Sequence, residues 1–288
     1  MKKSLFIKII SVICLLLVLC GSLVGCNNES TQNDSKIKIA VSIIPEETFV
    51  KWVAGDLVSV ITLIPNGASP ENYEPTAKQM ANFENSLLYF SIGVPTEEAN
   101  ILPRVSKNTK TVSLAEQVSA VYPDLKVGNE RDPHIWLSPK RVIVMLKAIA
   151  NELSLLDPEN KLTYTENAEK YINKLELLDS QLRDELSSVE KRKFIVFHPA
   201  FAYFADDYSL EMYALEEHGK EVTPKHIEEM VDFAKAEGIT AVFYQAETDS
   251  HQAKAFAENI GGKTVMLSPL SADYIENLKT MANLIGRN

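Results

Sequence analysis

The chain has 288 residues, of which 45% are hydrophobic and 24% charged, and its formal net charge is -10. This acidity argues against nucleic acid as a partner, because nucleic-acid-binding surfaces are normally basic. The apolar fraction is typical of a globular protein, and the length allows two ordinary domains or one large one.

The N-terminal segment has the pattern of a secretory signal. Three lysines within the first eight residues precede an apolar stretch over residues 9–19, which is too short for a spanning helix of ~20 residues. The following Leu-Val-Gly-Cys sequence resembles the lipobox of bacterial lipoproteins. That resemblance implies cleavage after Gly25 and a diacylglyceryl thioether on Cys26; a plain secreted protein is the alternative.

We therefore expect a lipid-anchored protein on the extracytoplasmic face of the cell membrane. Removal of the three signal lysines changes the formal charge from -10 to -13. The polar residues 26–35 predict a flexible tether, so that the folded body begins near Lys36. All three cysteines, Cys14, Cys20 and Cys26, lie in or directly after the signal. The body can form no disulfide, and any metal site in it must use imidazole and oxygen ligands.

Beyond the tether, short β-rich runs alternate with amphipathic helical patterns, which is typical of βα units around a parallel sheet. We expect two α/β lobes, at residues 36–156 and 191–288, each with a mainly parallel four-stranded sheet and flanking helices. The predicted strands are Lys38–Ile44, Val58–Ile64, Leu87–Ile92 and the run near Thr111–Leu114, then Phe194–Phe197, Met212–Leu215, Ala241–Gln245 and Thr264–Leu267.

A long helix is predicted between the two lobes. Ser138 and Pro139 are typical of a helix start, for a helix ending near Leu155, and the pair Asp157-Pro158 repeats this signal. Apolar residues then recur at three- and four-residue steps from Leu162 through Ala168, Tyr171, Ile172, Leu175, Leu178 and Leu182 to Leu186. This spacing predicts a helix of ~30 residues. We interpret residues 157–190 as a rigid connector whose apolar stripe is buried against both lobes; a coiled-coil partner helix is the alternative.

Four loops carry side chains suited to binding chemistry. In open α/β sheets, ligands bind beyond the carboxyl ends of the strands. Glu71, His198 and Glu247 each follow a predicted strand, and His134 lies in a loop just before the connector helices. We expect all four to meet in one cleft.

The chain has five histidines. His218, in a predicted turn, and His226, in the first turn of a predicted helix, are expected at the surface. His251 lies near a helix start and stays a weaker candidate because it is close to Glu247. His134 and His198 suit zinc or a neighbouring metal as neutral imidazole ligands.

Four segments carry a family pattern: Pro65–Pro75, Asp132–Pro139 (Asp-Pro-His-Ile-Trp-Leu-Ser-Pro), Phe197–Phe204 and Leu267–Leu270. Together they resemble the metal-binding lipoproteins of zinc and manganese ABC importers. The resemblance covers essentially the whole mature chain and is most specific in the second segment. It implies two lobes joined by a long backbone helix, a single metal between them, little hinge closure, ligands at His134 and His198, and a non-catalytic role that passes the ion to an ABC permease.

Two positions depart from the family pattern. Glu71 stands where zinc-binding members usually have histidine, and Ser268 stands where many members have aspartate. A carboxylate can replace an imidazole, so Glu71 is a tenable ligand, whereas a serine hydroxyl is a poor one. Glu247 is the leading candidate to complete the site, with Asp273 or Asp249 behind it, and water is a further possibility. We favour Zn²⁺; Mn²⁺ and Fe²⁺ are alternatives, because exchange of imidazole for carboxylate moves a site toward them.

Two other classes of protein are weighed against this interpretation. A lipid-anchored metallohydrolase would use an open zinc position with Glu247 as its base, but the chain has no His-Glu-x-x-His helix or nucleophile elbow. A surface adhesin or solute receptor would bind an organic ligand, and no aromatic or arginine-rich cluster indicates one. We expect a monomer.

Overall fold

The computed structural model describes residues 36–216, 222–247 and 250–288, and Ile37–Asn288 forms one compact unit. Cys26, the tether, His218 and Asp249 lie outside the described residues, so the expectations for them stay predictions. Within the described ranges, no helix is both long enough and apolar enough to cross a membrane.

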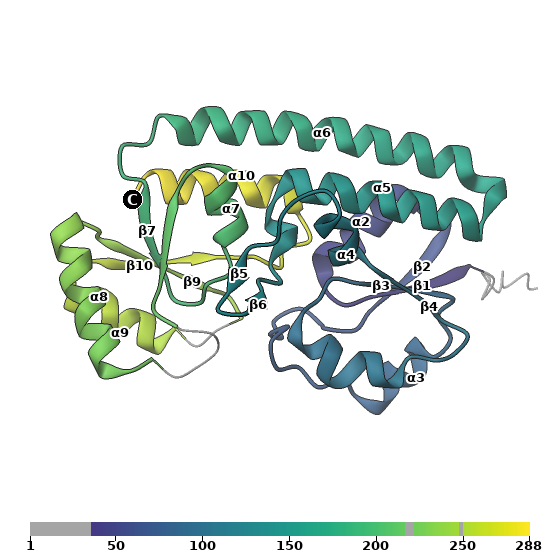
Figure 1. The fold of residues 1–288 in the computed structure, drawn as a ribbon, viewed down its shortest axis with the longest axis horizontal. Helices are drawn as coiled ribbons and strands as arrows, with labels where there is room; N and C mark the ends of the chain where they lie inside the picture. Colours follow the sequence, from purple (N-terminus) through teal and green to yellow (C-terminus); the bar gives the residue numbers. More distant parts are fainter. Residues whose placement is uncertain (1–35, 217–221, 248–249) are drawn as a thin grey trace, which may run out of the picture. The chain divides into compact units, whose positions relative to one another are not determined.

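Two four-stranded sheets, all of whose strands are parallel, organise the two lobes (Figure 1). The N-terminal sheet has the order β2-β1-β3-β4 and the C-terminal sheet the order β10-β9-β7-β8. All eight predicted strands are present, with ends shifted by up to three residues. Their bounds are β1 Ile37–Val41, β2 Val58–Thr62, β3 Leu88–Ser91, β4 Lys110–Ser113, β7 Lys193–Val196, β8 Glu211–Ala214, β9 Ala241–Gln245 and β10 Lys263–Leu267.

Helices follow the strands, as parallel connections require. The N-terminal lobe has α2 Ile44–Ala54, α3 Ala77–Phe83 and α4 Leu114–Ser119, and the C-terminal lobe has α7 Ala202–Asp207, α8 Pro224–Glu237, α9 His251–Asn259 and α10 Tyr274–Gly286. A short antiparallel hairpin, β5 Lys126–Val127 and β6 Glu130–Arg131, leads into the loop that carries His134.

The helical connection has two members, α5 (Pro139–Leu156) and α6 (Lys161–Ser187). Ser138 caps α5, as predicted, by accepting a hydrogen bond from the Arg141 amide. Helix α6 packs along α5 and α2 and also contacts α10 of the C-terminal lobe, and Figure 1 shows it running past both sheets. Its predicted stripe is buried from Ala168 to Leu186, with Tyr171 and Ile172 half-buried.

The prediction for Leu162 is wrong, because this side chain is 69% exposed. Tyr164 takes the buried position in the first turns of α6 instead, with no exposed surface. Its hydroxyl donates to the Asp157 carboxylate at 2.7 Å, just before the helix. Leu162 lies six residues before Ala168, which at 3.6 residues per turn places it about 120° away around the helix, whereas Tyr164 lies four residues before Ala168 and on the same face.

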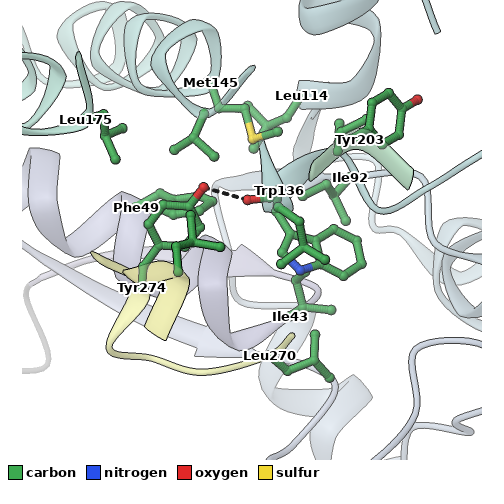
Figure 2. Close-up of a cluster of buried hydrophobic side chains, with 14 of the residues drawn as sticks. Ile43, Phe49, Ile92, Leu114, Trp136, Met145, Leu175, Tyr203, Leu270 and Tyr274 are labelled. Atoms are coloured by element: carbon green, nitrogen blue, oxygen red, sulfur yellow. Dashed lines mark hydrogen bonds between the residues drawn. The ribbon is translucent and has the colours of Figure 1, made fainter. Parts of the chain in front are cut away.

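One hydrophobic core continues from the first lobe into the second (Figure 2). Trp136, from the loop before α5, is 1% exposed and packs in this core. Its indole nitrogen donates to the Pro269 carbonyl at 2.9 Å, and its own carbonyl accepts from the Tyr274 hydroxyl at 2.7 Å. The ring of Tyr274 meets Phe49 of α2 edge to face. These contacts join residues that are more than 130 positions apart, so the two lobes share buried surface near the site.

Each sheet has one point where the connections change direction. In the N-terminal sheet this point lies between β1 and β3, and in the C-terminal sheet it lies between β7 and β9. The chain leaves the sheet in opposite directions at such a point, which opens a crevice at the carboxyl ends of the strands. His198 follows β7 and Gln245 ends β9, so both lie at the second of these crevices.

Candidate metal centre

Glu71 is held in a loop between β2 and α3. The loop opens with a turn in which the Ala68 amide donates to the Pro65 carbonyl at 3.1 Å, and Gly67 takes φ +80°, which glycine adopts without strain. The Pro70 carbonyl accepts a hydrogen bond from the Thr96 amide at 3.1 Å. The backbone on either side of Glu71 is thereby fixed, and its half-buried carboxylate faces the two candidate histidines.

His134 is 7% exposed, and Asp132, which is fully buried, fixes its orientation. One oxygen of Asp132 accepts from the His134 backbone amide at 2.9 Å and from ring nitrogen Nδ1 at 2.7 Å. Because a carboxylate can only accept, Nδ1 carries the proton. The neutral ring therefore presents the lone pair of Nε2 to the cleft.

His198 is 8% exposed and is oriented in the same way from the other lobe. Its Nδ1 lies 2.8 Å from a carboxylate oxygen of Glu216, the second residue after β8. Nδ1 is again the donor, so that Nε2 is free of its proton in the neutral ring. In each histidine, a carboxylate that contacts Nδ1 fixes the orientation and the tautomer of the imidazole ring, as is usual for histidines that bind metals.

The three side chains place three electron-pair donors around one point. The Nε2 atoms of His134 and His198 are 3.4 Å apart. Glu71 Oε1 lies 3.7 Å from the Nε2 of His134 and 3.8 Å from the Nε2 of His198. Ligand atoms bound tetrahedrally to zinc at ~2.0–2.1 Å lie ~3.3 Å from one another. A small closing movement would give these donors that spacing. Without a cation, two nitrogen lone pairs and a carboxylate would face each other unfavourably.

A cavity of about 20 Å³ adjoins these donors. That volume is roughly what one water-sized sphere occupies, so it fits a single ion and excludes an organic ligand. Its walls include Trp136 and Gln245 as well as Pro269 and Leu270 from the loop after β10. Both lobes therefore contribute donors and walls to one site.

Comparison with known proteins identifies the family of the chain. Residues 39–287 match the family model described as "Zinc-uptake complex component A periplasmic". The chain belongs to this family.

Individual relatives differ in the metal that they are named for. The zinc-binding lipoprotein AdcA of Streptococcus pneumoniae is 31% identical over 91% of this chain and 56% of its own length, so the chain spans little more than half of that relative. The manganese ABC transporter substrate-binding lipoprotein PsaA of Streptococcus mitis is 29% identical over 90% of this chain and 87% of its own. A crystal structure of a zinc-bound ZnuA deletion mutant superposes with a TM-score of 0.82 at 35% identity, covering 87% of this chain and 97% of that one.

Other residues predicted for this family site lie outside the three-donor cluster. Among the described residues, the group of metal-binding atoms that lie within 4.8 Å of one another contains Glu71, His134 and His198 only. Asp273 is exposed before α10, and the side chain of Ser268 does not line the 20 Å³ cavity, although Pro269 and Leu270 beside it do. The assignment of these two residues as ligands stays a prediction.

Glu247 follows β9 and has a half-buried side chain. One of its carboxylate oxygens is buried without a hydrogen-bond partner among the described residues, and burial raises its pKa above the ordinary value. Glu247 does not line the 20 Å³ cavity, and it is not a member of the three-donor cluster. Its role as a fourth ligand therefore also stays a prediction.

Two residues that shape the site were not singled out from the sequence. Gln245 is the last residue of β9 and lines the cavity, and Glu216 follows β8 and orients His198. Both lie at carboxyl ends of strands, where the rule that located His198 applies equally. The sequence signal was present, but it did not distinguish them from other polar residues after strands.

Replacing Glu216 by glutamine is expected to weaken zinc binding by ~10–100-fold, because a neutral amide no longer polarises or fixes His198 as a carboxylate does. Zinc affinity is measured by competition with a chromogenic chelator. Glu211→Gln is the matched control, since that exposed carboxylate, at the start of β8 and five residues before Glu216, accepts a hydrogen bond from the nearby Tyr213 hydroxyl. Equal affinities for the two variants would show that the Glu216 contact has no bearing on the metal.

Proposed function

We propose that this protein captures one divalent transition-metal ion, zinc in preference to manganese or iron, between its lobes outside the cytoplasmic membrane and delivers it to an ABC permease. The observation that supports this most directly is the facing pair of Nε2 lone pairs at 3.4 Å with the Glu71 carboxylate beside them. A cation between these groups would relieve the repulsion of their lone pairs. Imidazole nitrogen and carboxylate oxygen, with no thiolate, suit Zn²⁺ best by ligand type.

The names of the relatives support the transport role. AdcA is named as a zinc-binding lipoprotein and PsaA as a manganese transporter's substrate-binding lipoprotein. Manganese is the alternative because one carboxylate takes a histidine position in this site. A hydrolytic role has less support, since Glu247, the candidate base, does not line the cavity that adjoins the donors. A non-catalytic binding protein is the function that we propose.

The N-terminal pattern supports a place of action at the membrane surface. We propose that lipid on Cys26 and the tether of residues 26–35 hold the body beside the membrane in which the permease lies. Anchoring both partners in one membrane raises the effective concentration of the loaded protein at its permease, without any new contact. A soluble monomeric body is sufficient for this role.

The purified full chain, stripped of metal and then exposed to zinc or manganese, is expected to retain one ion per chain in native mass spectrometry. Binding to the folded state also raises its stability, by ~2.7 kcal/mol at a free-metal concentration one hundred times the dissociation constant. The melting temperature should therefore rise, and by more with zinc than with manganese. A chain that retains neither ion and melts at the same temperature in both would refute the proposal.

A further inference from the structure

The three clustered donors leave a bound ion one ligand short. Glu71, His134 and His198 supply three ligand atoms, whereas zinc in proteins is usually bound by four. Glu247 and Asp273, which the sequence suggested as further ligands, do not line the 20 Å³ cavity that adjoins the donors. Among the described residues, the fourth ligand is therefore to be sought in the wall of this cavity, and otherwise it is solvent.

Gln245 is the wall residue best suited to the fourth position. Among the described residues that line the cavity, Gln245 and Ser69 carry the neutral polar side chains, and the Ser69 hydroxyl oxygen already accepts a hydrogen bond from the Glu71 amide at 3.3 Å. Gln245 is 7% exposed. Its side-chain carbonyl oxygen has two lone pairs, and carbonyl oxygens are established ligands of divalent ions.

The sheet places Gln245 beside His198. Phe243 of β9 pairs with Val196 of β7, and Gln245 and His198 each stand two positions after a member of this pair. On its other side, Gln245 pairs with Leu267 at the end of β10. Strand β9 thus lies inside the sheet, with a neighbour on each side. A ligand at the end of such a strand is positioned more precisely than a ligand on a loop.

The charges around the ion favour a neutral fourth ligand. Asp132 and Glu216 contact the Nδ1 atoms of the two histidines, and Glu71 faces the Nε2 atoms. These carboxylates bring three negative charges against the two positive charges of the ion. A fourth carboxylate would add uncompensated charge to a largely buried site, which is costly. An amide oxygen binds the ion without adding charge.

Water is the competing ligand. A larger cavity, of about 390 Å³, is lined by the same three donors but not by Gln245, and solvent in it is close to the ion. The cavity that Gln245 lines has only about 20 Å³, which is roughly the volume of one water-sized sphere. An ion in this smaller cavity leaves no room for a water molecule between itself and Gln245, which favours direct contact.

We propose that the side-chain carbonyl oxygen of Gln245 is the fourth ligand of the bound metal ion. The inference rests on the proposed metal-binding function. It gives the ion two ligands from each lobe, Glu71 and His134 from the first and His198 and Gln245 from the second. Carbonyl oxygen is a harder donor than imidazole, so this ligand keeps the site open to manganese as well as zinc.

The test uses Co²⁺ in place of Zn²⁺, because the visible bands of Co²⁺ change with its ligands. Imidazole, a neutral ligand, is added at concentrations that leave the metal in the protein. The purified full chain should keep its spectrum unchanged, since all four positions are filled by protein atoms. Gln245→Ala should bind water in the vacated position, so imidazole should shift its spectrum.

Zinc affinity gives a second measurement on the same variants. Gln245→Ala should lower it by ~10-fold or more. Gln245→Glu, which keeps an oxygen donor, should retain both zinc binding and a spectrum that imidazole does not change. Gln252→Ala is the matched control, because that residue is exposed in the first turn of α9 and does not line the cavity.

A shift of the parent spectrum by imidazole would overturn the inference, because the fourth position would then hold solvent, and this measurement needs no variant. Unchanged zinc affinity in Gln245→Ala would overturn it too. Lowered affinity in Gln245→Ala without any response to imidazole would indicate a packing role and would also contradict it. These results leave the proposed function intact. If the parent chain binds neither zinc nor cobalt, the inference and the proposed function fail together.

Discussion

Replacing His198 by alanine is expected to lower the affinity of the chain for zinc by at least about a hundredfold, more than the loss of a residue that only orients a ligand. The substitution removes one of three donors and leaves His134 and Glu71, which come from the other lobe. The ion would then have no protein ligand from the C-terminal lobe among the three clustered donors. Competition titration against a chelator of known affinity measures the loss directly.

His226→Ala is the control for this experiment. That residue lies in the first turn of α8, its Nε2 is 3.2 Å from the Ala214 carbonyl oxygen, and it lies outside the donor cluster. The control should bind zinc as the parent does. His134→Ala should resemble His198→Ala, because the two rings have equivalent roles. If His198→Ala bound zinc within threefold of the parent, the three-donor site would be the wrong one.

Much of the fold was predictable because its signals are local. The run Ile37–Val41 and its seven counterparts are short, apolar and followed by turn or loop residues, so eight strands were recognised without knowledge of their partners. The start of α5 was equally local, since Ser138 and Pro139 specify it within two residues. Leu162 shows the limit of such reasoning: we assigned it to the buried stripe, but it lies about 120° around the helix from Ala168 and is 69% exposed.

The site was predictable at His134, which a specific motif marks, and at His198, where a motif and the end of a predicted strand coincide. Residues that act through tertiary contacts gave no comparable signal. Glu216 reaches His198 from the loop after the neighbouring strand β8, 18 residues away. Such pairs depend on which strands are neighbours, and composition and spacing do not specify that order.

The two histidines come from different lobes, so their separation depends on how firmly the lobes are joined. Directly after their loops, α5 and α7 are linked by a buried ion pair between Arg141 and Asp207, at 2.9 Å. Lys140 and the Ser138 hydroxyl also donate to the Asp207 carboxylate, each at 2.5 Å. The Arg141 guanidinium lies 4.4 Å from the ring centre of Tyr203. This network fixes the start of α5 against the end of α7, and with them the loops of His134 and His198.

The hydroxyl of Tyr203 adds a second link between the lobes. It donates to the Asp132 carbonyl at 3.1 Å and accepts from the Leu125 amide at 3.1 Å, so α7 is bonded to the loop that carries His134. Burial, reinforced by the nearby charge of Asp132, raises the pKa of Tyr203 to about 12. The hydroxyl therefore keeps its proton at physiological pH and remains a donor. These links are consistent with a site whose two halves are held near their binding positions.

Removing the Asp207 carboxylate should consequently be among the most destabilising single changes in the chain. Asp207→Ala leaves the Arg141 charge, which is 2% exposed, without its anion, and loss of one member of a buried ion pair costs ~3–5 kcal/mol. The free energy of unfolding is measured by urea denaturation of the metal-free chain.

Two further variants serve as controls for this prediction. Asp206→Ala, at the adjacent exposed position, should change the free energy of unfolding by less than ~0.5 kcal/mol. The double variant Arg141→Met with Asp207→Ala should regain part of the loss, because it no longer buries an unpaired charge. A loss below 1 kcal/mol for Asp207→Ala alone would mean that the lobes are held together by their shared apolar core.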